Sequence, residues 1–226
     1  MPAVLSHYTT FQSFHINPKF VNSYISRICN QLEPYFSEVP QNQKSPLVIH
    51  TLADAKCYWG TPTKQKSPLT ITNLVTVLDN LTVSNIHDDL LFNAQLNTGF
   101  TGLLCLGKMT CPDMISLRDY KKVMMCFSIK FYSHIYSFLL PTHKADTTFK
   151  GNHIAVKMIT GTPNPYPIME CYIKSHNLLF HFHLQLWLKS DGTIPLRSWF
   201  LKCLHHYFGS HITGQSLQVG GATARV

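Results

Sequence analysis

Two histidine pairs are the first residues whose spacing suggests chemistry, because imidazole is a common protein ligand for metals. The pairs are His181-Phe182-His183 and His205-His206. A zinc site needs three or four convergent ligands, usually at helical or hairpin spacing, and neither pair shows that pattern. The seven cysteines are an odd set without CxxC spacing, which indicates reduced thiols rather than a disulfide framework. No P-loop, GxGxxG, nucleophile elbow or HExxH occurs, so we predict no metal and no cofactor.

An excess of positive charge is the second chemical feature. The 226 residues include 19 Lys and Arg against 11 Asp and Glu, and the net charge of +8 favours an anionic partner. Only 13% of the residues are charged, whereas 45% are apolar, which is enough for a sizeable core. The basic side chains that could bind an anion, or could simply be solvated, fall in two groups: Lys56, Lys64 and Lys66, then Arg118, Lys121 and Lys122.

The elements that must position these side chains form two groups. Apolar residues recur at helical spacing from Asn17 to Glu33, and Pro18 suits the first turn of a helix there. A stretch rich in Pro, Gly and Lys follows later and reads as a linker at 59–68. The expected organisation is therefore a helical region at 1–58, the basic linker, and a second domain at 69–226.

The second domain reads as helices, then a sheet, then helices. Thr70 can cap a helix through Leu81, and Asp88 can cap a longer one through Leu104. Three β-prone runs predict a small antiparallel sheet: 123–131, 135–140 and 153–159. Further helices are expected near 168–175, from 195 to 207 and from 214 onward. The fold class is α+β, mostly helical, with a three-stranded antiparallel sheet.

Three stretches of the second domain carry a family pattern. Residues 97–109 (NTGFTGLLCLGKM), 140–146 (LPTHKAD) and 214–224 (GQSLQVGGATA) occur in this order. The first resembles a small-residue helix with R-x-x-E, the second a hairpin that carries a lysine, and the third H-x-L-R followed by small residues. Together they resemble the tyrosine recombinases, DNA breaking and rejoining enzymes, especially those of eukaryotic mobile elements. The resemblance covers about 67–226, and region 1–58 resembles part of a core-binding domain.

The resemblance implies phosphoryl transfer on DNA. In that family a tyrosine attacks a phosphodiester, two arginines hold the phosphate oxygens, and the hairpin lysine protonates the leaving oxygen. Lys144 matches the hairpin lysine. The side chains expected to contact DNA are Lys64, Lys66, Arg118, Lys121, Lys122 and Lys144.

The decisive positions depart from the family pattern. Cys105 stands at the first arginine, Lys108 at the acidic residue, and Gln215 and Gln218 at the His and Arg of the second box. The sequence also ends at Val226, before the point where the family's tyrosine would be expected. We therefore expect a DNA-binding protein of the recombination and integration class that lacks strand-transfer activity.

Decay of a mobile element explains most of these departures. Arg to Cys, Glu to Lys and Arg to Gln each need one C-to-T or G-to-A change, whereas His to Gln needs a transversion. The leading interpretation is an inactive, C-terminally truncated relic of such an element. The alternatives are a protein-interaction module on the same fold and an active recombinase completed by a longer gene product.

Partners and location follow from the same features. We expect weak DNA binding through the phosphate backbone, with self-association as a second kind of contact. Residues 1–10 lack the pattern of a signal peptide, and no apolar run reaches the ~18 residues of a membrane span. The expectation is an intracellular protein without a membrane partner, and the nucleus is one candidate compartment.

Overall fold

The computed structural model describes residues 1–61, 67–81, 84–141 and 150–225. The chain divides into two compact units, Met1–Gln65 and Lys66–Val226, and each is described by itself. Among the described residues, no helix is long and apolar enough to cross a membrane.

The described part of the first unit is helical. Its elements are α1 (Pro2–His15), α2 (Pro18–Leu32), α3 (Val39–Gln43) and α4 (Pro46–Trp59). Each begins with a proline in its first turn, where the missing backbone N–H costs nothing. The predicted helix at 17–33 is confirmed as α2, whose first turn is capped by the Asn17 side chain accepting from the Lys19 N–H. The other three helices were not predicted.

Helices α1 and α4 lie side by side and run in the same direction. The hydroxyls of Ser6 and Thr51 share a hydrogen bond of 2.7 Å, and the rings of Phe14 and Trp59 are 4.6 Å apart. In each pair the two residues are 45 positions apart in the sequence. The same residues of α1 and α4 therefore stay side by side from one end of the two helices to the other. The core of this unit consists of Leu5, Val21, Ile25, Cys29, Val39, Val48 and Leu52.

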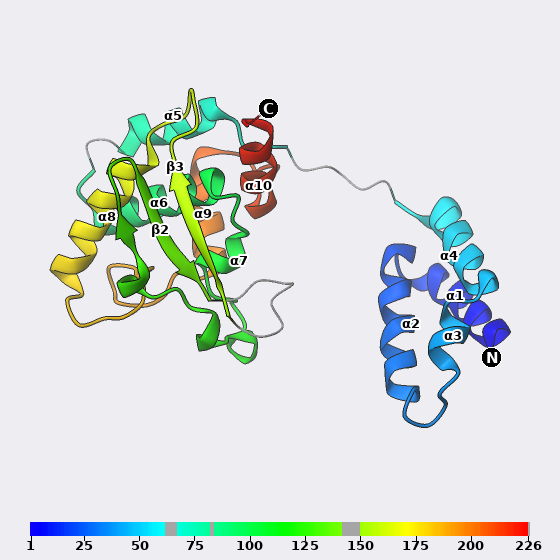
Figure 1. Cartoon of the computed structure of the whole chain (residues 1–226). Helices are drawn as coiled ribbons and strands as arrows, with labels where there is room; N and C mark the ends of the chain where they lie inside the picture. The colour runs from blue at the N-terminus through cyan, green and yellow to red at the C-terminus, as the bar shows by residue number, and fades with distance from the viewer. Residues whose placement is uncertain (62–66, 82–83, 142–149, 226) are drawn as a thin grey trace. The chain divides into compact units, whose positions relative to one another are not determined.

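The second unit is built around one central helix, α6 (His87–Thr101). The helices around it are α5 (Ile71–Leu81), α7 (Leu106–Met109), α8 (Pro165–Leu179), α9 (Arg197–Tyr207) and α10 (Gly214–Thr223). Figure 1 shows strands β2 and β3 on one side of α6, with α8 and α10 on either flank. Because α6 is covered on nearly every side, it buries polar residues such as Gln95 and Thr98 as well as apolar ones.

The bounds of α6 differ from those predicted. Asp88 lies in the first turn, and Ile86, not Asp88, is the N-cap residue. The helix ends at Thr101 rather than continuing to Leu104, because the chain turns at Leu103, whose φ of 53° is incompatible with a right-handed helix. The first-box pattern therefore spans two elements, α6 and the short α7.

The predicted three-stranded antiparallel sheet is confirmed, in the order β1-β2-β3. Its strands are β1 (Lys130–Phe131), β2 (Ile135–Leu140) and β3 (Asn152–Lys157). The prediction of a strand from 123 to 131 is wrong over most of its length. Only its last two residues pair within the sheet, and Cys126–Ser128 form a 3-10 turn, one of three in 115–128.

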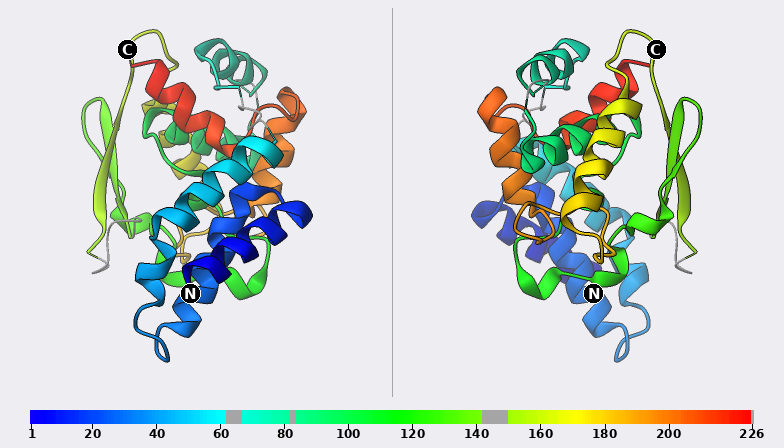
Figure 2. Two further views of the ribbon diagram at one scale, coloured as in Figure 1. Left: turned by 90° about the vertical axis from the view of Figure 1, so that its right-hand side faces the viewer. Right: turned by 90° about the vertical axis from the view of Figure 1, so that its left-hand side faces the viewer.

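A single core joins the sheet to the helices of the second unit. Tyr136 and Phe138 of β2 are fully buried against it, and Figure 2 shows the sheet edge-on as an outer layer. Phe100 of α6, Tyr172 of α8 and Phe200 of α9 fill its centre. The α+β, mostly helical fold class is therefore confirmed.

Candidate functional site

The two box segments, more than 100 residues apart in sequence, meet at the C-terminal end of α6. Gly214, the first residue of α10, lies so close to Leu106 of α7 that a Cβ there would be 2.8 Å from Leu106 Cδ2. The Gln218 side chain of α10 donates from Nε2 to the carbonyl oxygen of Leu103 at 2.9 Å. The fold thus joins the end of the first box to the helix that carries the second.

Small residues make this close contact possible. A Cβ at Gly220 would lie 1.9 Å from the carbonyl oxygen of Leu69, and one at Gly221 would lie 2.0 Å from that of Phe100. Both distances are far inside van der Waals contact, so only glycine fits at either position. The small residues after the second-box positions therefore have a structural role, which is to let α10 approach α6.

The four positions at which the sequence departs from the recombinase pattern differ in exposure. Cys105 is exposed at the N-cap of α7, and Lys108 is half-buried in that same short helix. On α10, Gln215 is exposed, whereas Gln218 is half-buried with its amide nitrogen committed to Leu103. These four positions lie on or directly before two contacting helices, α7 and α10. Three of their side chains are neutral and the fourth, Lys108, is a lysine.

Three of the predicted DNA contacts, Lys64, Lys66 and Lys144, lie outside the described residues. The other three, Arg118, Lys121 and Lys122, lie in the turns between α7 and β1. The guanidinium of Arg118 donates to the carbonyl oxygens of Pro112 and Asp113, at 3.0 and 3.2 Å. Lys122 Nζ lies 3.1 Å from Asp119 Oδ2. Arg118 and Lys122 thus have partners within their own loop, and Lys121 is exposed.

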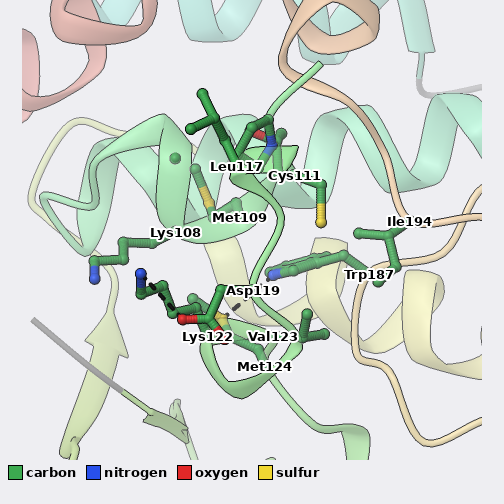
Figure 3. Close-up of a pocket in the computed structure, with 13 residues that line it drawn as sticks. Lys108, Met109, Cys111, Leu117, Asp119, Lys122, Val123, Met124, Trp187 and Ile194 are labelled. Atoms are coloured by element: carbon green, nitrogen blue, oxygen red, sulfur yellow. Dashed lines mark hydrogen bonds and ion pairs between the residues drawn. The ribbon is translucent and has the colours of Figure 1, made fainter. Parts of the chain in front are cut away.

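A small pocket of about 150 Å³ lies between α7, this loop and Trp187. Figure 3 shows the Lys108 and Lys122 side chains on one side of it, and the Cys111 thiol and Trp187 ring on the other. Trp187 Nε1 donates to the thioether sulfur of Met124 at 3.4 Å. Lys122 adds a second positive charge on the side of the pocket that holds Lys108, a box position, although the two lysines come from different elements.

A second, larger recess lies where β3 approaches the end of α10, and sequence reasoning missed it. Its volume is about 830 Å³, and its lining includes Lys157 of β3 and Arg225 just beyond α10. The Arg225 guanidinium donates to the carbonyl oxygen of Thr101, the last residue of α6. Lys157 gave no signal in the sequence, since a lysine at the end of a strand is ordinary. Arg225 directly follows the second-box segment at 214–224, and this position was the one sequence signal that pointed to the recess.

Two buried tyrosines of the second unit are not poised to attack a phosphate. The Tyr136 hydroxyl lies 2.7 Å from Thr98 Oγ1, and burial raises the pKa of Tyr136 well above its ordinary value. The Tyr172 hydroxyl donates to the Leu186 carbonyl oxygen at 2.8 Å, and burial likewise raises its pKa. Both side chains are core residues that carry a satisfied polar group.

One cysteine and histidine pair also fails the test for nucleophilic chemistry. Cys126 Sγ lies 4.0 Å from His176 Nδ1, and His176 Nε2 lies 2.9 Å from the Gln185 carbonyl oxygen. Burial raises the pKa of the Cys126 thiol and lowers that of His176. Burial therefore favours the neutral thiol and neutral imidazole, whereas an activated pair needs the thiolate.

The histidine pairs do not gather with other ligands. Within the part of the chain that the structure describes, no group of three or more His, Cys, Asp or Glu could hold a metal ion. His205 Nε2 instead lies 3.0 Å from the Ile212 carbonyl oxygen, where it fastens α9 to the chain before α10.

Comparison with known proteins adds no family to this description. No protein-family model matches the chain, and no curated protein matches it.

Proposed function

We propose that this chain is a DNA-binding protein built on a recombinase-like core, and that it does not cut DNA. The observation that carries the proposal is the meeting of α7 and α10 at the end of α6, which joins the box segments around 103–108 and 214–218. A site for one phosphate must gather its donors in this way, because each has to reach the same group.

Charge supports DNA as the ligand. The second unit, 66–226, has 14 Lys and Arg against 8 Asp and Glu, and so carries +6 of the net charge of +8. Lys157 and Arg225 line the recess beside the box segments, and Lys108 lies on α7. Lysine and arginine bind the DNA backbone without reading its sequence, so the expected binding is weak and tolerant of sequence.

The same positions argue against cleavage. The side chains at the two arginine positions are Cys105 and Gln218, and neither can carry the positive charge that a phosphoryl-transfer site uses on the developing anion. The amide nitrogen of Gln218 is already bonded to Leu103. Binding without chemistry is the function that these side chains support best.

Fluorescence anisotropy with a duplex at several salt concentrations tests the proposal. Each phosphate neutralised contributes about 0.9 to the log–log salt slope, so the double variant Lys157→Ala/Arg225→Ala should reduce that slope by up to about 2. Lys174→Ala is the matched control, because Lys174 lies on α8 in an ion pair with Glu170, away from the recess. Lys64→Ala/Lys66→Ala tests the linker prediction in the same assay.

Two results would reject DNA binding at this recess. One is an affinity that does not change between low and moderate salt. The other is an equal loss of affinity in Lys174→Ala and in the double variant, since that would show a diffuse response to charge rather than a local contact.

A second candidate function, a protein-interaction module, is favoured by apolar side chains on two loops of the second unit. The loops are joined by a hydrogen bond of 2.7 Å from the Cys126 N–H to the Leu184 carbonyl oxygen. Their exposed apolar residues are Met114, Ile115, Leu117, Phe127, Phe182 and Leu184. Salt-insensitive binding to a purified protein partner, lost in Phe127→Ser, would support this function over DNA binding.

A further inference from the structure

Helix α1 of the first unit buries mainly polar side chains, with Leu5 as its one fully buried apolar residue, and exposes several large apolar ones. The side turned into the unit carries Ser6, Thr9 and Ser13, which are 0–8% exposed. The side turned outward carries Val4, Phe11 and Phe14, which are 59–64% exposed. A helix on a monomer surface normally does the opposite, so the outward side has the composition of a contact surface.

The buried polar side is fully explained by contacts within the unit. Thr9 Oγ1 donates to the Leu5 carbonyl oxygen and Ser13 Oγ to that of Thr9, both at 2.7 Å. Ser6 shares its hydrogen bond with Thr51 of α4, which fixes the rotation of α1 about its axis. The buried hydroxyls are thus satisfied, and the contact between Ser6 and Thr51 leaves Val4, Phe11 and Phe14 on the outward side.

The apolar surface continues onto the end of α4. The Phe14 ring lies 4.6 Å from Trp59, and the Trp59 ring lies 6.1 Å from Tyr58. Trp59 is 40% exposed and Tyr58 is 82% exposed. Figure 1 shows α1 and α4 next to each other in this unit. We call Val4, Phe11, Phe14, Tyr58 and Trp59 the α1 surface.

The size of the α1 surface suits a modest protein interface. An aromatic side chain buries about 150–250 Å² when fully covered. Given their exposed fractions, the four aromatic residues alone offer roughly 500 Å². A stable interface uses ~800 Å² per partner, so these residues and their surroundings can form the apolar centre of one.

Charge argues against an anionic occupant. Pro2–His15 contains no Lys, Arg, Asp or Glu, although the whole chain has 30 such residues. An anionic partner such as DNA or an acidic membrane needs cations, and α1 offers no Lys or Arg. A second copy presents the same apolar, uncharged helix, and two such helices can meet without like-charge repulsion. We propose that the α1 surface is the contact between two copies of this chain.

This inference is independent of the proposed function, because the recess and the box segments belong to the second unit. Sedimentation equilibrium of the full chain over a wide range of concentrations tests it. We expect a reversible monomer–dimer equilibrium, weakened at least about tenfold in Phe11→Ser/Phe14→Ser, since buried aromatic residues dominate such contacts.

Phe20→Ser/Tyr24→Ser is the matched control. It removes two exposed aromatic side chains from α2, outside the α1 surface, and should leave the dimer unchanged. Circular dichroism of both variants checks that the helices remain, which is expected because all four side chains are exposed.

A photo-crosslinking amino acid in place of His7, which is exposed on α1, identifies what covers the surface. Crosslinked dimers joined through α1 are expected. A monomer at every concentration, equal dimerisation of the Phe11→Ser/Phe14→Ser variant, or a crosslink only within one copy would each overturn the proposal.

Discussion

The Gln218 side chain on α10 donates a 2.9 Å hydrogen bond to the carbonyl oxygen of Leu103, the residue at which the chain turns with a φ of 53°. This bond connects Gln218, which the sequence comparison with the recombinase pattern places at an arginine position, to the turn that ends the central helix. Gln218, at a position predicted to bind phosphate, instead bonds to the backbone of the same unit.

Replacing Gln218 with leucine should destabilise the second unit. The Leu103 carbonyl loses its side-chain donor, and a lost hydrogen bond of this kind costs about 1 kcal/mol. Urea unfolding followed by tryptophan fluorescence measures the loss. Gln215→Leu, three residues away on the exposed side of α10, should change the free energy of unfolding by less than about 0.5 kcal/mol. Equal effects of the two substitutions would contradict the structural role of Gln218.

Gly220→Ala should destabilise the second unit more strongly. The added methyl group would lie 1.9 Å from the Leu69 carbonyl oxygen, so α10 has to move away from the core, at a cost of about 3 kcal/mol or more. The midpoint of urea unfolding reports this change.

Gly107→Ala is the matched control for the glycine test, because a Cβ at Gly107 meets nothing within 4 Å. Alanine is the better helix former by roughly 1 kcal/mol, so this variant should be neutral or slightly stabilised. Tolerance of Gly220→Ala would show that α10 does not sit as closely on the core as described.

Asp191 should make stability depend on pH in the acid range. Its Oδ2 lies 2.7 Å from Lys189 Nζ, and its Oδ1 accepts from the Thr193 hydroxyl and N–H at 2.6 and 2.9 Å. The bonds from Lys189 and Thr193 lower the pKa of Asp191 from 3.8 to about 2. Because the folded state has the lower pKa, the contribution is complete above the unfolded pKa and is lost as the pH falls through about 2.

The stability difference between the native chain and Asp191→Asn should therefore be constant near neutral pH. It should shrink as the pH falls below about 4. Urea midpoints at a series of pH values measure it, and Asp79→Asn, an exposed acid on α5, serves as the control. A difference that grows on acidification would contradict the assigned direction.

No covalent adduct with DNA is expected from this chain. Loss of one oriented donor to a developing oxyanion costs ~10²- to 10³-fold in rate, and both arginine positions lack positive charge. A nicked suicide substrate analysed on a denaturing gel detects any adduct. An adduct mapped to a tyrosine of the unmodified chain would overturn the inactive assignment.

Periodicity predicted α2, which buries one side only. Helix α2 places Val21, Ile25 and Cys29 in the core at regular spacing, and this signal was strong enough to locate both ends. Helix α1 was not predicted because most of its large apolar residues, Val4, Phe11 and Phe14, are exposed, while three of its four buried residues are Ser or Thr. Helix α6 is buried all round, and its exact end depended on a turn at Leu103 that propensity does not encode.

Long-range partners account for the remaining differences. Residues 123–129 have strand-like side chains, but Met125 pairs only in an isolated bridge with Gln185, and the neighbouring residues form turns. The recess between Lys157 and Arg225 depends in the same way on the placement of β3 against the end of α10. The order of the three box segments could be read from the sequence. The side chains that meet in the folded unit could not be predicted from it.

The second unit closes through its two ends. The Leu69 N–H, just before α5, donates to the carbonyl oxygen of Ser216 on α10 at 3.0 Å, and the Leu69 carbonyl lies against Gly220. These contacts span nearly the whole unit, so their loop-closure entropy is among the largest that its folding has to overcome. During synthesis, the segment around Leu69 leaves the ribosome long before its partner exists. The contacts of Leu69 with α10 are therefore expected to form only after α10 has emerged, so a core that begins with Leu69 waits for a helix made well over 100 residues later.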